Sequence, residues 1–158
     1  MPTTLTRNRP LWFFADLAVV HVRGEDTDGR LGIVEITMPA GDEPPLHVHH
    51  DHDEIFCVLE GELTLYLPGR EQLVRAGEVF VAPRGVPHIY RAGDQGARAL
   101  VQSSPAGFEA FVEAVSVEAD GERLPEPAGP PTAEQVARLA EIAAEQGIEL
   151  IGPPGARP

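Results

Sequence analysis

The sequence contains no lysine, one cysteine and no long apolar run, and each shortage excludes a class of protein. All 12 basic residues are arginines, which excludes a lysine Schiff base and the lysine of a P-loop. Cys57 is the single cysteine, so no disulfide can form within the chain, and we expect a reducing, cytoplasmic location. No stretch approaches the ~20 apolar residues that span a bilayer. The polar stretch 1–10 predicts neither a signal peptide nor a membrane anchor.

Positive charge is also scarce. The chain has 25 acidic residues against 12 basic ones, a formal net charge of −13. Proteins that bind duplexes gain affinity by neutralising phosphates with basic side chains, so we expect no nucleic-acid partner. The remaining composition is that of one globular domain, because 158 residues with 42% hydrophobic and 23% charged residues suffice for a single buried core.

Up to residue 103 the sequence predicts short strands separated by turn residues. Aromatic and β-branched residues recur between glycine and proline breaks. The predicted strands are 11–14, 17–23, 31–38, 46–50, 55–60, 62–67, 78–82, 88–91 and 97–103. Many short strands with such turns indicate an antiparallel sandwich or barrel. We therefore predict an all-β barrel domain over residues 1–103.

Helical signals replace the strand pattern after residue 103. Ser104 followed by Pro105 resembles an N-cap and first turn. Further on, Thr132 and Gln135 form a capping-box pair in front of an apolar stripe. That second helix would dock on its own barrel or on a partner subunit, and we favour its own barrel. Residues 104–158 are thus predicted to be a helical and proline-rich C-terminal extension packed on the barrel.

The histidines supply the strongest chemical signal, because four of the six lie within residues 47–52. Side chains alternate along an extended segment, so His47 and His49 project from one face and can bind one cation together. Glu54 is expected to point into the barrel, where an unpaired charge is costly. His88 begins a later strand that a closed barrel would bring beside these residues. Imidazole with carboxylate suits Fe, Mn, Ni, Cu, Co or Zn.

Two spaced motifs carry a resemblance to a known family. The first runs Gly41, five residues, His47, one residue, His49, four residues, Glu54, six residues, Gly61. The second runs Gly77, five residues, Pro83, one residue, Gly85, two residues, His88. Over residues 41–91 the chain thus resembles the cupin superfamily, and the fifteen residues between the motifs resemble the short spacing of microbial single-domain cupins. Ala92 stands where the family usually has asparagine, which puts the local turn geometry in question more than the metal site.

The resemblance implies a fold, a cofactor and an assembly. The fold is the antiparallel double-stranded β-helix, or jelly roll, with its motif core at residues 41–91. The cofactor is one divalent transition metal held by four ligands. These ligands are His47, His49, Glu54 and His88. Cupins of this size commonly form homodimers, and the apolar strand 11–14 would offer an exposed edge for the pairing.

The tail is similar to that of small quercetin-dioxygenase-like cupins from bacteria, which implies a dioxygenase acting on a small apolar, phenolic or enolisable substrate. Glu54 would then serve as a ligand and as the catalytic base. Strand alternation and position predict a substrate pocket lined by Leu46, Phe56, Val58 and Tyr90. The same alternation directs Cys57 away from the metal.

Three alternatives remain open at this stage. The same ligands suit a non-redox cyclase or isomerase, and also a non-catalytic small-molecule binder or sensor. A triad of His49, Asp51 and His88, with Arg98 for a keto acid, resembles 2-oxoglutarate-dependent oxygenases but leaves the motif glycines unexplained. His50 and His52 fall on the opposite alternation from the ligands, so we expect them in a loop or facing outward.

Overall fold

The computed structural model describes residues 8–158, so the first seven residues of the predicted 1–103 domain lie outside the described residues. The elements in chain order are β1 (Leu11–Phe13), β2 (Asp16–Val22), η1 (Gly24–Thr27), β3 (Gly32–Met38), β4 (Pro45–His49), β5 (Asp53–Leu67), β6 (Arg70–Arg75), β7 (Val79–Ala82), β8 (Ile89–Ser104), α1 (Phe108–Val115), β9 (Val117–Glu118), α2 (Ala133–Glu145) and β10 (Ile148–Pro154). Strands dominate and the paired strands are antiparallel, which confirms the predicted fold class.

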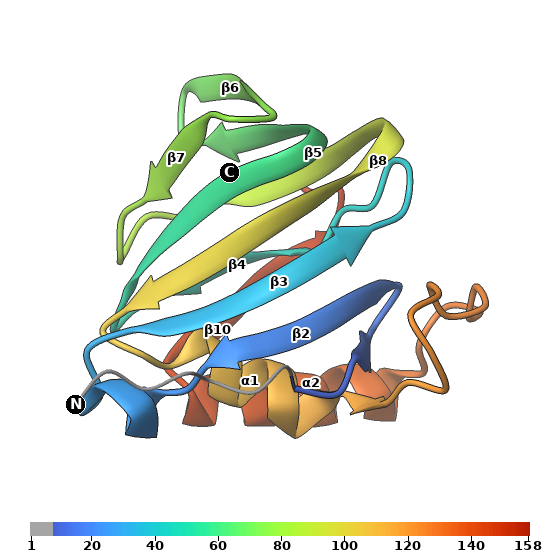
Figure 1. Ribbon diagram of the computed structural model, residues 1–158. Coiled ribbons are helices and arrows are strands. Elements are labelled where there is room, and N and C mark those ends of the chain that lie inside the picture. The colour runs from blue at the N-terminus through green and yellow to red at the C-terminus, as the bar shows by residue number, and fades with distance from the viewer. Residues whose placement is uncertain (1–7) are drawn as a thin grey trace.

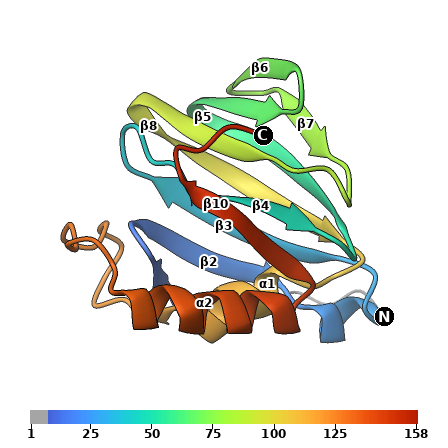
Figure 2. The same cartoon turned by 180° about the vertical axis from the view of Figure 1, so that it is seen from behind.

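The strands form a barrel from two sheets. The large sheet has the order β6-β5-β8-β3-β2-β1-β9, with β7 also paired to β5, and β4 pairs with β10 in a second sheet. Figure 1 shows the broad surface of the large sheet, with α1 and α2 at one end of the molecule. The opposite view shows β10 and β4 in front of that sheet (Figure 2). A backbone bridge between His47 and His88 ties the two sheets together and closes the jelly roll.

Two strands are longer than the sequence predicted. β5 continues through Gly61, where a turn was expected, and β8 continues through Gly93. Gly61 has φ +71°, and a Cβ at that position would lie 2.3 Å from the backbone oxygen of Gly96. The pairing of β5 with β8 shifts register on both sides of this residue. The glycine therefore bends a continuous strand, with a positive φ that side chains other than glycine rarely adopt.

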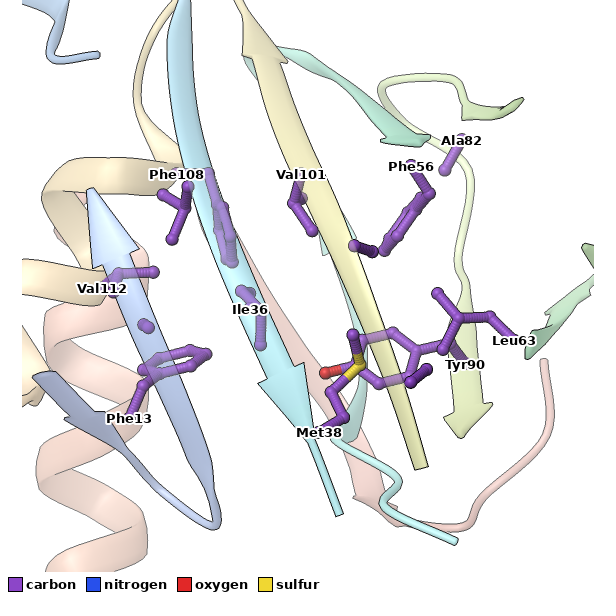
Figure 3. Packing of buried hydrophobic residues seen from close by; sticks show 14 of the residues in the cluster. Phe13, Ile36, Met38, Phe56, Leu63, Ala82, Tyr90, Val101, Phe108 and Val112 are labelled. Atoms are coloured by element: carbon purple, nitrogen blue, oxygen red, sulfur yellow. The ribbon is translucent and has the colours of Figure 1, made fainter. Parts of the chain in front are cut away.

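The hydrophobic core fills the space between the sheets. Alternate residues of β5 point inward, so that Phe56 and Val58 are buried. Cys57 lies on the other side of the strand, where its Sγ is 3.2 Å from Nε2 of Gln102. Figure 3 shows the buried side chains of β3, β5 and β8 together with those of α1. Burial of the apolar side chains provides most of the driving force for closing the barrel.

The first helix begins later than predicted. Ser104 is the last residue of β8, and Gly107 is the N-cap of α1, which starts at Phe108. The N-cap prediction for Ser104 was wrong because pairing with β5 keeps this residue in the sheet. The ring of Phe108 packs edge-on against Phe13, with 6.1 Å between their centroids. This contact anchors α1 to the barrel through β1.

The second helix begins as predicted. Thr132 Oγ1 accepts a hydrogen bond from Gln135 N at 3.2 Å, and Thr132 N donates to Gln135 Oε1 at 2.8 Å, which confirms the capping box. Ala143 is its single fully buried residue, and Val136 is 47% exposed. α2 therefore covers the end of the barrel without closing it tightly. No helix of residues 8–158 is long and apolar enough to cross a bilayer.

The sequence did not predict β6 or β10. β10 pairs with β4 so that Ile148 lies opposite His49 and Leu150 lies opposite His47. Part of the predicted extension 104–158 therefore forms a barrel strand next to the predicted ligands. The strand 11–14 was predicted to be an exposed edge. It is not one, because β1 pairs with β2 on one side and with β9 on the other.

Candidate metal centre and cavity

Two strands and the residue just before a third bring the four predicted ligands together. His47 and His49 alternate with buried Val48 on β4, and Glu54 lies at the start of β5. The backbone of His88 exchanges two hydrogen bonds with His47, of 3.0 and 3.3 Å between N and O. One potential ligand atom from each of the four side chains lies within 4.8 Å of all the others. Such a cluster of imidazoles with one carboxylate suits a metal ion.

The tautomers of two histidines follow from their hydrogen bonds. Nδ1 of His47 lies 2.7 Å from the carbonyl oxygen of Pro45, and Nδ1 of His88 lies 3.1 Å from that of Val86. A carbonyl oxygen only accepts, so each Nδ1 carries the proton and the Nε2 faces the cluster. Metal-binding histidines in general have their second nitrogen fixed in this way.

His49 obtains the equivalent contact from another histidine. Its Nδ1 lies 2.7 Å from Nε2 of His52, and both side chains are buried. Nε2 of His49 has no hydrogen-bond partner among the described residues, although it lies 3.3 Å from Glu54 Oε2. A buried nitrogen without a hydrogen bond, pointing into a group of three other donor atoms, fits a metal ligand.

The electrostatics of the cluster hold His47 and Glu54 in the protonation states that ligands require, whereas Glu54 favours a proton on His88 that a bound metal would replace. Burial, together with His88 and His49, lowers the pKa of His47 to about 3, so this imidazole is neutral near pH 7. Burial alone would raise the pKa of Glu54, but His49 and His88 outweigh it and hold that pKa well below the usual value. Burial opposes protonation of His88, but its contact with Glu54, 2.9 Å from Nε2 to Oε2, raises the pKa of the imidazole.

The cluster opens onto a cavity of about 780 Å³. His47, His49, Glu54 and Tyr90 form part of its polar lining. Aromatic and aliphatic side chains from β1, both helices and β10 supply most of the rest. These include Phe13, Phe108, Phe111, Leu139, Ile142 and Ile148. The cavity is thus largely apolar and can hold a small organic molecule beside the metal cluster.

The other predicted pocket residues lie deeper than Tyr90. Leu46, Phe56 and Val58 are buried but are not among the residues that line this cavity. The ring of Phe56 packs against Tyr90 and His88, with 5.9 and 6.5 Å between the centroids. Phe56 therefore packs behind Tyr90, which lines the cavity, and behind His88 of the metal cluster.

His50 and His52 lie in the loop after β4, as expected, but His52 does not face outward. His50 is exposed and lies 2.8 Å from Glu149, but His52 is 1% exposed and contacts His49. Strand alternation fails here because β4 ends at His49 and the following loop turns the next side chains. Burial and the neighbouring His49 lower the pKa of His52 to about 4.

The structure does not assemble the rival triad. Asp51 is exposed in the loop after β4, whereas Glu54 shares the cluster with His49 and His88. The guanidinium of Arg98 forms ion pairs with Glu35 and Glu60 at 3.0 and 2.6 Å. The arginine proposed for a keto acid is therefore engaged elsewhere.

Sequence reasoning missed two acidic residues that line the same cavity. Asp16 begins β2 and is 3% exposed, and Asp42 lies in the loop before β4. The available signal was the aspartate at the start of an apolar strand, Asp16 to Val20. A charged residue at such a position needs a partner or a function.

Comparisons with known proteins agree with this geometry. The family model described as the cupin domain matches residues 34–102. The chain is 39% identical to quercetin 2,3-dioxygenase of Bacillus subtilis over 79 residues, 50% of this chain and 23% of that protein. It is 41% identical to oxalate oxidase 1 of Hordeum vulgare over 59 residues, 32% of this chain and 29% of that protein. The matched region spans about a quarter of these relatives.

Solved structures show the same fold. An RmlC-like cupin from Shewanella frigidimarina has a TM-score of 0.53 at 22% identity, covering 65% of this chain and 86% of that one. The polyketide cyclase RemF from Streptomyces resistomycificus has a TM-score of 0.51 at 24% identity, covering 66% of this chain and 79% of that one. At these identities the likeness concerns the fold alone.

Proposed function

Because the chain belongs to the cupin superfamily, we propose that it is a metal-dependent dioxygenase acting on a small apolar, phenolic or enolisable molecule. The observation that carries the proposal is the convergence of three imidazoles and one buried carboxylate at the polar end of a mostly aromatic and aliphatic cavity. The likeness to a quercetin dioxygenase over half of this chain supports the choice of reaction.

His47, His49, Glu54 and His88 would hold one divalent transition metal, chosen from Fe, Mn, Ni, Cu, Co and Zn. When bound, a redox-active metal would supply the chemistry needed to activate dioxygen, and any of these metals would act as a Lewis acid. The fixed Nδ1 contacts of the histidines keep their Nε2 atoms directed at the cluster. The protein thus orients its ligands before an ion binds.

Glu54 has a second role in the proposal. Its carboxylate remains ionised at neutral pH and lines the cavity, so it can accept the proton of a substrate hydroxyl. Tyr90 would contact the substrate, while Leu46, Phe56 and Val58 would shape the pocket from behind. The apolar lining would exclude water from the reacting group.

Metal analysis and dioxygen consumption test this function together. In protein purified without added metal, His47→Ala and His88→Ala should lose most bound metal, whereas exposed His50→Ala should retain it. Dioxygen should be consumed with a phenolic substrate such as quercetin. Glu54→Gln should retain part of the metal and lose about 10²–10⁴-fold in turnover, and Glu60→Gln on the same strand is the control.

Several outcomes would change the proposal. Full metal occupancy in both histidine variants would place the metal elsewhere. Turnover that proceeds unchanged without dioxygen would replace the dioxygenase with a non-redox cyclase or isomerase. Wild-type turnover by Glu54→Gln would leave Glu54 as a ligand only.

The partners belong to the same proposal. A small molecule would be the substrate, and the chain would act as a homodimer in the cytoplasm. The exposed valines of β7 support the dimer, because Val79 is 60% and Val81 50% exposed on a strand whose partner within residues 8–158 is β5. An apolar edge strand is an aggregation hazard unless another chain covers it.

A further inference from the structure

A second polar group lines the cavity without belonging to the metal cluster. It consists of Asp16 on β2, Asp42 in the loop before β4 and Tyr90 on β8. The side chain of Asp16 interacts with those of Asp42 and Tyr90. Tyr90 also lies within electrostatic range of Glu54, so the two polar groups share one space. Figure 3 shows Tyr90 in the core, among side chains of β3 and β5.

The two carboxyls of this group hold a proton between them near neutral pH. Burial, reinforced by the charge of Asp42, raises the pKa of Asp16 well above its usual value. Burial also raises the pKa of Asp42 to about 6, although a hydrogen bond from Asp16 opposes that rise. Protonated Asp16 therefore donates to an ionised Asp42, as paired buried carboxyls do in general. Asp42 keeps lone pairs that this one bond does not use.

A purely structural role explains the pair of Asp16 and Asp42 poorly. The buried Glu109 shows how a structural carboxylate is satisfied in this protein. Glu109 is 4% exposed, and its carboxylate accepts hydrogen bonds from Gly24 N, Gly107 N and Ser103 Oγ at 3.0, 2.9 and 3.1 Å. Asp16 is equally buried, yet its Oδ1 has no hydrogen-bond partner within residues 8–158. Leaving a buried oxygen unsatisfied costs stability.

The acidic residues of this region also differ in whether an arginine forms an ion pair with them. Glu43 lines the cavity next to Asp42, and Oε1 of Glu43 lies 3.0 Å from the guanidinium of Arg157. Within the described part of the chain, neither Asp16 nor Asp42 has such an ion pair with an arginine. The negative charge of the pair is thus available to whatever occupies the cavity.

We propose that Asp42 is the acceptor of a hydroxyl-binding subsite, with Asp16 and Tyr90 as positioning residues, which takes the O–H of a phenol or enol. This extension rests on the proposed function, since it assumes a small organic ligand in the cavity. The aromatic lining from Phe13, Phe108 and Phe111 suits a flat neutral ring. A hydroxyl on that ring donates to the carboxylate without placing a second charge in an apolar space.

Two probes that differ by one O–H donor test the subsite. Zinc-loaded protein under argon is titrated with 2-naphthol and with 2-methoxynaphthalene, and both dissociation constants are measured by calorimetry. The wild type should bind 2-naphthol about tenfold or more tightly than the ether, because a hydrogen bond to a charged group provides discrimination of that size. In Asp42→Ala the ratio should fall to about one. Asp42→Asn, which keeps the side-chain shape, should give an intermediate ratio.

Glu43→Gln is the matched control, since it removes a neighbouring carboxylate that also lines the cavity, and it should keep the wild-type ratio. Zinc content and thermal midpoint show whether each variant is folded. A wild-type ratio in Asp42→Ala would mean that the metal or another group recognises the hydroxyl, and would overturn the subsite. Equal binding of both probes by the wild type, or binding of neither, would overturn it as well.

The positioning role of Asp16 is tested by conservative rescue. Asp16→Asn retains a donor toward Asp42 and should keep most of the preference for 2-naphthol, whereas Asp16→Val should lose it. Equal ratios in the two variants would remove Asp16 from the subsite. Binding without oxygen is independent of turnover. A protein that discriminates the probes but consumes no dioxygen would keep the subsite and lose the dioxygenase.

Discussion

His52 is the residue whose position matters most for the metal cluster without belonging to it. Backbone carbonyls fix the orientation of His47 and His88, from Pro45 on β4 and from Val86 in the turn before β8. The contact to His49 comes instead from a side chain in a loop, 2.7 Å away. Loops move more readily than strands, so the orientation of His49 depends on how this one imidazole packs.

We predict that His52→Ala lowers zinc affinity by about 10–100-fold, the usual effect of removing a residue that orients a ligand. Competition with a chromogenic chelator measures the affinity. His52→Gln should recover part of the loss, because its amide oxygen can accept the Nδ1 proton of His49. His50→Ala is the control from the same loop. An unchanged affinity in His52→Ala would show that His49 needs no such support.

Asp42 provides a prediction about pH and stability. Its pKa is raised from 3.8 to about 6 in the folded protein, mainly by burial. The folded state therefore binds this proton more tightly than the unfolded state. The resulting stabilisation is complete below about pH 4 and disappears as pH rises through 6.

Asp42→Asn should consequently raise the thermal midpoint at pH 8, where the wild type bears a buried charge, and the difference should shrink toward pH 4. Thermal unfolding of both proteins across this range measures it. Asp94→Asn, whose side chain is 96% exposed, controls for the general relief of repulsion in a chain of net charge −13. A midpoint difference that stays constant with pH would contradict the linkage.

Among the secondary-structure elements, β10 contributes both to the fold and to the site. It pairs with β4 beside the ligand strand, and Ile148 lies opposite His49 with 2% of its surface exposed. Ile151 on the same strand is 44% exposed. β10 therefore has one buried position and one solvent-facing position of the same residue type.

Ile148→Ala should lower the free energy of unfolding by about 2–5 kcal/mol, since truncating a buried isoleucine loses its transfer free energy and leaves a cavity. Ile151→Ala should change it by less than about 0.5 kcal/mol. Denaturant titrations of the two variants give both values. Similar losses at the two positions would mean that β10 packs differently from the structure.

For the whole molecule the main prediction is the homodimer. Its expected interface is no longer the β1 edge, which β9 covers, but the β7 face with Val79 and Val81. Sedimentation at micromolar concentration should give twice the chain mass, and Val81→Asp should shift it toward 17.0 kDa. Val117→Asp, an equally exposed valine beside β1, should leave the dimer intact. A wild-type monomer would exclude the dimer, and dissociation by Val117→Asp alone would return the interface to β1.

The sequence by itself determined the barrel and the four candidate ligands. Glycine and proline turns define the strands, and two-residue alternation places His47 and His49 on one face with Glu54 directed inward. Both are local properties that a strand fixes within a few residues. The spacing of the second motif then identified His88 through its resemblance to the cupin superfamily.

Tertiary structure alone decided the surroundings of the ligands. Asp16 and Asp42 meet only because β2 and the loop before β4 converge on one cavity, and their separation in sequence carries no sign of it. His52 turns inward because a loop does not follow strand alternation. β10 reaches β4 from about a hundred residues away along the chain. Such contacts depend on strand order and chain crossings, which residue periodicity does not encode.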